Sequence, residues 1–163
     1  MCTSCGSLED ALKLFDELLC ESSVYPWNVL LRGTVVSGGR KRQYIDVLKT
    51  YSKMRELGVE LNVYSFSSVI KSFAADPAFY QGLKTHALLI KNGLVDSDIL
   101  KTCLIDLYFK CGKVKLARSV FEEIPERERD VVVWGAMLSG FSHNMLWRML
   151  KKLSLFWLME LKL

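Results

Sequence analysis

Two stretches of this sequence share one pattern, and that repetition decides the fold. "LYFKCGKVKLARSVFEEIPE" (107–126) can be laid over "MCTSCGSLEDALKLFDELLC" (1–20), so that Cys5 falls on Cys111. Both stretches contain Cys-Gly, an aliphatic residue two positions later, an alanine, and a phenylalanine followed by acidic residues. A chain that repeats a helical pattern in this way is expected to stack copies of one structural unit.

Further matches give the repetition a period of about 35 residues, which is typical of helical solenoids. "RELGVELNVYSFSSVIKSF" (55–73) aligns with "IKNGLVDSDILKTCLIDLY" (90–108), with Gly58 on Gly93. "WNVLLRG" (27–33) matches "WGAMLSG" (134–140). Because a single helix pair cannot bury both of its apolar faces, neighbouring pairs are expected to stack into one array.

Each period is expected to form a helix, a short turn and a second helix. The expected helices cover residues 63–74, 83–91, 99–110 and 114–124. The first has an apolar stripe at helical spacing, made of Phe66, Val69, Ile70 and Phe73. The apolar residues of the second are Ala87, Leu88 and Ile90, and Gly93 is expected to end it. The strand-like run 131–134 lies where a further first helix should begin. The sequence therefore predicts an all-α fold.

The composition is that of a globular chain that can bury a core. Half of the 163 residues are apolar and a quarter are charged, and the net charge of +4 permits an anionic partner without requiring one. The five cysteines have no disulfide-scaffold spacing, which favours a reducing compartment. We recognise no targeting peptide ahead of the first repeat.

The apolar tail at 145–163 is interrupted by Arg148, Lys151 and Lys152, with Glu160 and Lys162 nearer its end. Its longest uncharged run, 153–159, is far shorter than the roughly 20 residues that span a bilayer. We therefore expect no membrane span, and a helix that lies on a membrane surface stays an alternative.

No residue cluster indicates catalysis. Cys2 and Cys5 have the spacing of a metal or redox pair, but no second pair completes a site, and His86 and His143 are isolated. Neither histidine is part of a His-x-Glu deaminase signature, and no glycine-rich phosphate loop joins a strand to a helix. We expect a structural role for the cysteines, and no metal, cofactor or enzymatic activity.

"VYSFSSVIKSF", "DLYFKCGKVKLARSVFEEIPE" and "VVVWGAMLSGF" resemble the pentatricopeptide repeat proteins, in particular the plant subclass that alternates P, L and S motifs. The resemblance covers roughly residues 1–144 and implies a right-handed α-solenoid of stacked helix-turn-helix repeats. It divides the chain into a partial S motif (1–23), a P motif (24–62), an L motif (63–97), an S motif (98–130), the start of a P motif (131–144) and a divergent tail (145–163).

Two departures from the family pattern lead to separate expectations. Extra residues around 37–43 predict a longer turn between the two helices of the first P motif. The expected second helix is missing after Asn144, which predicts a chain truncated at both ends.

The resemblance implies binding of single-stranded RNA, one base per repeat, in the RNA processing or editing of a chloroplast or mitochondrion. The second residue of each motif would wedge against a base, and the fifth and last residues would read its edge. The wedge residues are Tyr25, Tyr64, Ile99 and Val132. The reading pairs are Asn28 with Asn62, Ser67 with Ser97, and Thr102 with Asp130. Gly135, the fifth residue of the last motif, offers no side chain.

The first pair resembles the family's pyrimidine-preferring combination and the third its guanine-preferring one, which gives 5′-pyrimidine, any base, guanine-3′. Judged from the residues alone, Asn28 could instead cap a helix, and Thr102 could lie on a solvated face. Arg40, Lys41 and Arg42 would either contact phosphates or form a solvated loop.

Stacking and base reading in three repeats barely exceed the free-energy cost of association, so this chain alone is expected to bind RNA weakly. We expect no DNA partner. Proteins of RNA-processing complexes are possible further partners. The rival interpretations are a helical-repeat scaffold for other proteins and an inactive truncated fragment.

Overall fold

The computed structural model describes residues 24–37, 40–75 and 77–160, and their side chains at 24–34, 45–75 and 77–145. The helices are α2 (Val24–Ser37), α3 (Arg40–Glu56), α4 (Val63–Ala75), α5 (Phe79–Lys91), α6 (Asp98–Lys110), α7 (Val114–Glu122) and α8 (Val131–Glu160), with a 3₁₀ turn at Glu126–Glu128. No strand occurs in these ranges, and the run 131–134 opens α8. The predicted all-α helical-repeat fold is confirmed.

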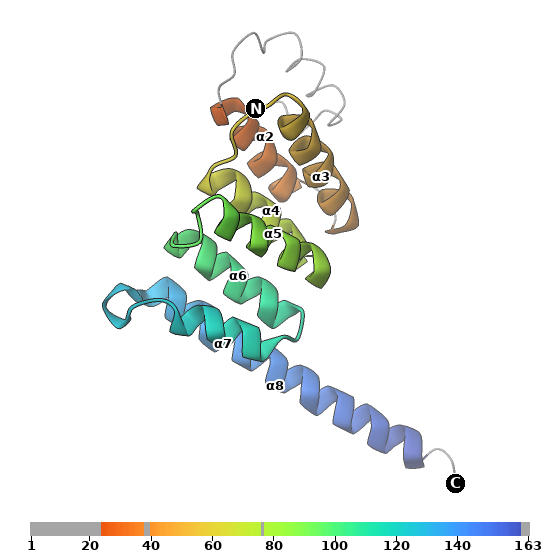
Figure 1. The fold of residues 1–163 in the computed structure, drawn as a ribbon. Coiled ribbons are helices and arrows are strands. Elements are labelled where there is room, and N and C mark those ends of the chain that lie inside the picture. The colour runs from red at the N-terminus through yellow and green to blue at the C-terminus, as the bar shows by residue number, and fades with distance from the viewer. Residues whose placement is uncertain (1–23, 38–39, 76, 161–163) are drawn as a thin grey trace.

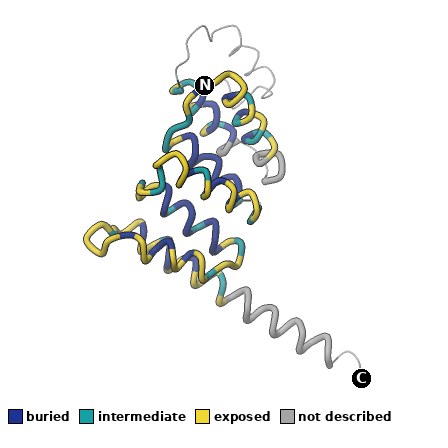
Figure 2. The backbone as a smooth tube through the Cα atoms, in the orientation of Figure 1, coloured by how far each residue is buried: buried dark blue, intermediate teal, exposed yellow. Residues whose placement is uncertain are grey.

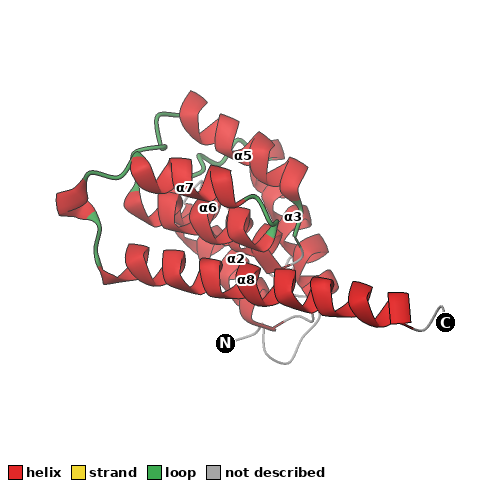
Figure 3. Cartoon of the chain, turned by 90° about the horizontal axis from the view of Figure 1, so that it is seen from below, coloured by secondary structure: helices red, strands yellow, loops and turns green. Residues whose placement is uncertain are grey.

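The helices form two layers (Figure 1). One layer contains α2, α4, α6 and α8, each packed against the next, and the view in Figure 3 places α3, α5 and α7 together on the other side. Helix α4 packs against α2, α3, α5 and α6, and α6 packs against α4, α5, α7 and α8. Every helix pair is thus covered by its neighbours, which is how an array of amphipathic pairs buries a continuous core.

Burial is most continuous along α4 and α6, in the middle of the stack (Figure 2). The predicted stripe of Phe66, Val69, Ile70 and Phe73 is buried, with at most 2% of each residue exposed. The corresponding residues of α6 include Leu104 and Tyr108, both nearly inaccessible. The 3.6-residue period therefore correctly identified the inner face of the first helices.

The buried face of α5 contains two residues that an apolar pattern does not mark. Its buried residues are Gly82, Thr85 and Leu89, whereas Ile90 is 59% exposed. Gly82 allows close packing on α6, because a Cβ there would lie 2.5 Å from the Leu107 Cδ2 atom. Of the apolar residues noted in the sequence, Leu88 is half-buried against the core, whereas Ala87 is exposed like Ile90.

Glycines with positive φ end helices in both layers. Gly93 (φ 67°) follows α5, and the next amide, Leu94 N–H, donates to Leu89 O at 2.9 Å. This is the 6→1 bond of a Schellman cap, and the left-handed conformation that it needs favours glycine. Gly112 (φ 69°) ends α6 in the same way. The predicted end of α5 at Gly93 is confirmed.

The longer turn expected around 37–43 is wrong. Helix α2 ends at Ser37 and α3 begins at Arg40, so the extra residues lengthen α3, which has 17 residues against 13 in α5. Arg40, Lys41, Arg42 and Gln43 are good helix formers and continue the helix rather than interrupt it.

Helix α8 runs for 30 residues, and the boundary expected at residue 144 falls inside it. Within the described ranges, no helix combines the length and the apolar character that crossing a bilayer requires.

Candidate nucleic-acid interface

The first helix of each pair begins at the residue where the sequence places the start of a motif. These residues are Val24 for α2, Val63 for α4, Asp98 for α6 and Val131 for α8. The last residue of each motif therefore directly precedes the first helix of the next. The second and fifth residues of each motif lie in the opening turns of its first helix. One register thus places all the predicted site residues near the same end of one layer (Figure 1).

The four predicted wedge residues are all large, apolar in body and exposed. The exposed fractions are 74% for Tyr25, 63% for Tyr64, 48% for Ile99 and 64% for Val132. Such side chains are thus exposed at the same position of the four first helices, α2, α4, α6 and α8. This repeating surface feature leaves each of them free to contact a planar group such as a base.

Asn28 and Asn62 are brought together although 34 residues separate them. Asn28 Nδ2 donates to Asn62 Oδ1 at 3.1 Å. Asn62 also caps α4, because its Oδ1 accepts from the backbone N–H groups of Tyr64 at 3.1 Å and Ser65 at 3.2 Å. The capping role considered for Asn28 therefore belongs to Asn62, and Asn28 lies inside α2.

The pair of Thr102 and Asp130 is not joined by a hydrogen bond among the described residues. Thr102, half-buried, donates its hydroxyl to Asp98 O one turn earlier, at 2.8 Å. Asp130 caps α8, with Oδ1 accepting from Val132 N–H and Val133 N–H, both at 2.9 Å. Asp130 is exposed, and its second carboxylate oxygen can still accept from a ligand.

Ser67 and Ser97 also remain apart. Ser67 is buried and donates to Tyr64 O at 2.9 Å, so its hydroxyl is held against its own helix. Ser97 occupies the N-cap position of α6, but its side chain makes no capping bond. Gly135 is exposed in α8, with no atom within 4 Å of the place a Cβ would take. The side chains of Arg40, Lys41 and Arg42 lie outside those described.

Ser65 is a member of this site that the sequence did not single out. It is fully buried at the start of α4, and its Oγ lies 2.6 Å from Asn28 Oδ1 and 3.2 Å from Asn62 Oδ1. Its position as third residue of the L motif carries no family expectation. A serine three residues after an N-cap asparagine was the available signal.

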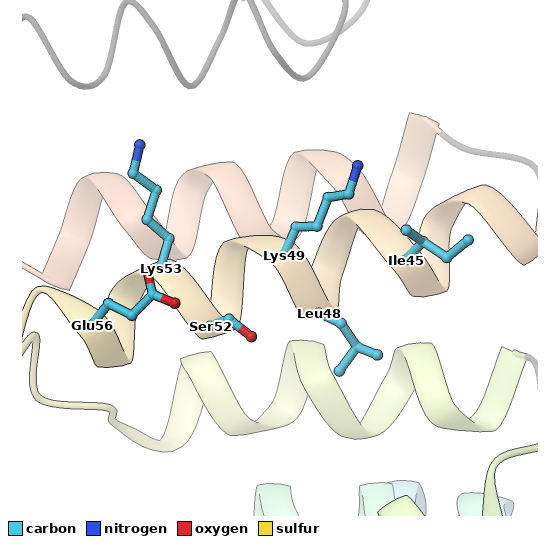
Figure 4. Close-up of a pocket in the computed structure, with 6 residues that line it drawn as sticks. All are labelled: Ile45, Leu48, Lys49, Ser52, Lys53 and Glu56. Atoms are coloured by element: carbon cyan, nitrogen blue, oxygen red, sulfur yellow. The ribbon is translucent and has the colours of Figure 1, made fainter.

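A separate hollow of about 400 Å³ lies on α3 (Figure 4). It is lined by Ile45, Leu48, Lys49, Ser52, Lys53 and Glu56. In Figure 4, Lys49 and Lys53 extend from α3 on the side opposite α4. All six residues come from a second-layer helix, so the hollow is separate from the predicted reading residues, which lie on or between first helices.

The described residues contain no group of three or more potential metal ligands. His86 is engaged instead in a 2.7 Å hydrogen bond between its Nδ1 and the Tyr108 hydroxyl. Cys103 and Cys111 are free thiols. The Cys2–Cys5 pair falls outside the described residues.

The sequence comparisons agree with this architecture. A family model described as the PPR repeat matches residues 1–22 and 101–128. A chloroplastic pentatricopeptide repeat-containing protein of Arabidopsis thaliana is 65% identical over 144 residues, or 88% of this chain and 20% of the relative. The chloroplastic protein DOT4 of the same plant is 33% identical over 88% of this chain and 16% of its own length.

A mitochondrial pentatricopeptide repeat-containing protein of A. thaliana is also 33% identical, over 88% of this chain and 20% of that relative. The chain thus spans a fifth or less of the length of these three relatives. The stacked helix pairs form an all-α helical-repeat solenoid, and its repeats are similar to pentatricopeptide repeats.

Proposed function

We propose that this chain binds single-stranded RNA along the layer of first helices, one base per repeat. In this proposal the exposed second residues wedge between bases, and the fifth and last residues of each motif contact a base edge. The motifs are assigned as P, L and S in turn, and the RNA is an organellar transcript that is processed or edited. The chloroplastic and mitochondrial descriptions of the relatives support the cellular setting.

The observation that carries the proposal is the Asn28–Asn62 hydrogen bond, with exposed Tyr25 and Tyr64 nearby in sequence. Two amides held together, each within three residues of an exposed tyrosine in the sequence, offer the elements that single-stranded RNA recognition uses. Stacking on the ring holds a base without regard to sequence, and hydrogen bonds to its edge select it.

The other two pairs are assigned differently. Ser67 is buried and bonded to its own helix, so the L motif reads no base in this proposal. Asp130 keeps one carboxylate oxygen that does not cap α8, and guanine N1–H and N2–H are the donors that it suits. The proposed preference is therefore 5′-pyrimidine, any base, guanine-3′.

The test is selection from a random RNA pool by filter binding, using a longer array in which these repeats are flanked by further ones. Asn28→Thr is compared with the unaltered array. A base-reading pair contributes about 1–3 kcal/mol of discrimination, so the preferred base at one nucleotide should change from pyrimidine to purine while the others hold. An unchanged selected sequence contradicts one-base reading by this motif.

A protein-binding scaffold is the second candidate, and α8 provides the observation that favours it. Trp134, Leu138, Phe141 and Met145 are exposed at helical spacing and form an apolar stripe. If the chain acts as a protein-binding scaffold through this stripe, Leu138→Glu in the longer array would abolish binding of the protein partner. The RNA sequence that the array selects would stay unchanged.

A further inference from the structure

Three polar side chains from two helices and the turn before α4 form one hydrogen-bonded cluster. Asn28 comes from α2, Asn62 caps α4, and Ser65 lies in the first turn of α4. Ser65 is 0% exposed, so its hydroxyl must find its partners inside the protein. Those partners are the two asparagines of the proposed reading pair.

The orientation of the Asn62 amide is set by the backbone. Its Oδ1 accepts from the N–H groups of Tyr64 and Ser65, which an amide nitrogen could not do. Since Asn62 thus presents its oxygen to Asn28, Asn28 must present Nδ2 in return, and this bond measures 3.1 Å. Asn62 therefore orients the amide of Asn28.

Ser65 fixes the other end of the Asn28 amide. A hydroxyl has one hydrogen, and the shorter contact, 2.6 Å to Asn28 Oδ1, receives it, against 3.2 Å to Asn62 Oδ1. Ser65 Oγ in turn accepts from Asn62 N–H at 3.4 Å. Asn28 is therefore held at both Nδ2 and Oδ1, and a flip of its amide would break two bonds at once.

This arrangement determines what the pair offers to a base. Asn62 Oδ1 already accepts from Asn28, Tyr64 and Ser65, and Asn28 Oδ1 accepts from Ser65 with one lone pair left. Each Nδ2 keeps N–H capacity beyond the bonds described, so the pair presents mainly donors. The O2 carbonyl shared by uracil and cytosine is an acceptor that such donors suit, and neither adenine nor guanine has a carbonyl at the equivalent C2 position.

We propose that Ser65, the third residue of the following repeat, is a positioning residue that sets the base preference of the Asn28–Asn62 pair. The specificity of one repeat then depends on a buried hydroxyl of the next. This inference rests on the proposed RNA-binding function and adds a residue to its specificity determinants.

The test measures RNA binding by the flanked array with Ser65→Ala. Without the hydroxyl, Asn28 Oδ1 loses its donor and the Asn28 amide is free to rotate. We expect pyrimidine-over-purine discrimination at the nucleotide facing Asn28 to fall about threefold to tenfold, which corresponds to one hydrogen bond, with preferences at other nucleotides unchanged. Ser65→Thr keeps the hydroxyl and should restore the discrimination.

Ser72→Ala is the matched control. Ser72 lies in the same helix, is also 0% exposed, and donates to Val69 O at 2.7 Å without contacting either asparagine. Its variant should keep the pyrimidine preference. Side-chain amide resonances of Asn28 and Asn62, measured by NMR without RNA, should shift in Ser65→Ala and stay in place in Ser72→Ala.

The outcomes separate the two proposals. If the unaltered array selects a pyrimidine and Ser65→Ala selects it equally well, the positioning role is overturned while the RNA-binding proposal stands. Equal losses in Ser65→Ala and Ser72→Ala would also overturn it, because they would reflect general destabilisation. If the unaltered array shows no RNA preference at all, both proposals fail.

Discussion

Gly140 in α8 lies directly against the Phe109 ring of α6. A Cβ at Gly140 would overlap Cγ and Cδ2 of that ring and come within 2.7 Å of its Cε2 atom. The ring has little room to move, since Phe109 is 2% exposed and makes an edge contact with Phe141, centroid to centroid 5.0 Å. Contact of the helix backbone with an aromatic ring is what allows α8 to pack closely on α6.

Gly140→Ala is therefore expected to destabilise the fold by about 1–3 kcal/mol, the usual cost of forcing extra volume into a packed interface. Urea unfolding followed by circular dichroism gives the free energy of unfolding. The matched control is Gly135→Ala, in the same helix with nothing within 4 Å of its Cβ position. It should stabilise by up to about 1 kcal/mol, since alanine is the better helix former. Equal effects of the two variants would contradict this packing.

The hydrogen bond between His86 and Tyr108 predicts a pH dependence of stability. Burial lowers the pKa of His86, and the more weakly acting Glu123 carboxylate opposes this shift. Burial, with smaller contributions from Cys111 and Glu123, raises the pKa of Tyr108 to about 12. At neutral pH both groups are therefore uncharged, and His86 Nδ1 and the Tyr108 hydroxyl share a 2.7 Å hydrogen bond whose direction depends on the His86 tautomer.

Because the folded-state pKa of His86 lies below its unfolded value of about 6.5, the unfolded chain binds the proton more readily. Its contribution to stability is complete above pH 6.5 and is lost as the pH falls toward the folded-state pKa. The free energy of unfolding should thus decrease between pH 7.5 and 5. His86→Gln should show a smaller decrease over that interval, and an identical pH profile would disprove the assignment.

Residue patterns were sufficient to predict the all-α helical-repeat fold. The 35-residue period and the stripe from Phe66 to Phe73 were sufficient for the stacked helix pairs, because apolar spacing reports directly on burial. Helix α5 shows the limit of this reasoning. Its inward side is marked by Gly82 and Thr85, whose small size matters only once α6 is in place.

For the site, sequence register located Asn28 and Asn62 but not the bonds between them. Motif positions treat the three reading pairs as equivalent, yet only Asn28 and Asn62 are joined in the described structure. The difference arises from local competition for hydrogen bonds. The hydroxyl groups of Thr102 and Ser67 donate to backbone carbonyls of their own helices. The longer amide side chain of Asn28 instead donates to Asn62.

Asp130 combines a helix cap with a proposed base contact, and two substitutions separate these roles. Asp130→Ala removes the acceptor for Val132 N–H and Val133 N–H and should cost about 1 kcal/mol of stability. Asp130→Asn keeps a capping oxygen, so thermal stability should change little. If the carboxylate also reads guanine, the asparagine variant of the flanked array should lose guanine preference at that nucleotide in the pool selection. Retained guanine preference in Asp130→Asn would remove this contact from the proposal.

Tyr64 provides the sharpest test of which layer faces RNA, because the chain contains a matched tyrosine on the other layer. Tyr64 in α4 is 63% exposed, and Tyr80 in α5 is 78% exposed, so neither substitution to alanine removes a buried side chain. Stacking of a base on an aromatic side chain contributes about 1–3 kcal/mol. Tyr64→Ala should therefore weaken RNA binding by the flanked array by roughly fivefold or more, whereas Tyr80→Ala should leave the dissociation constant unchanged.

Fluorescence anisotropy with a labelled oligonucleotide measures the dissociation constants of both variants, and circular dichroism checks that both variants remain folded. A loss confined to Tyr80→Ala would place the RNA on the layer of α3, α5 and α7 and overturn the assignment of the first helices as the binding face.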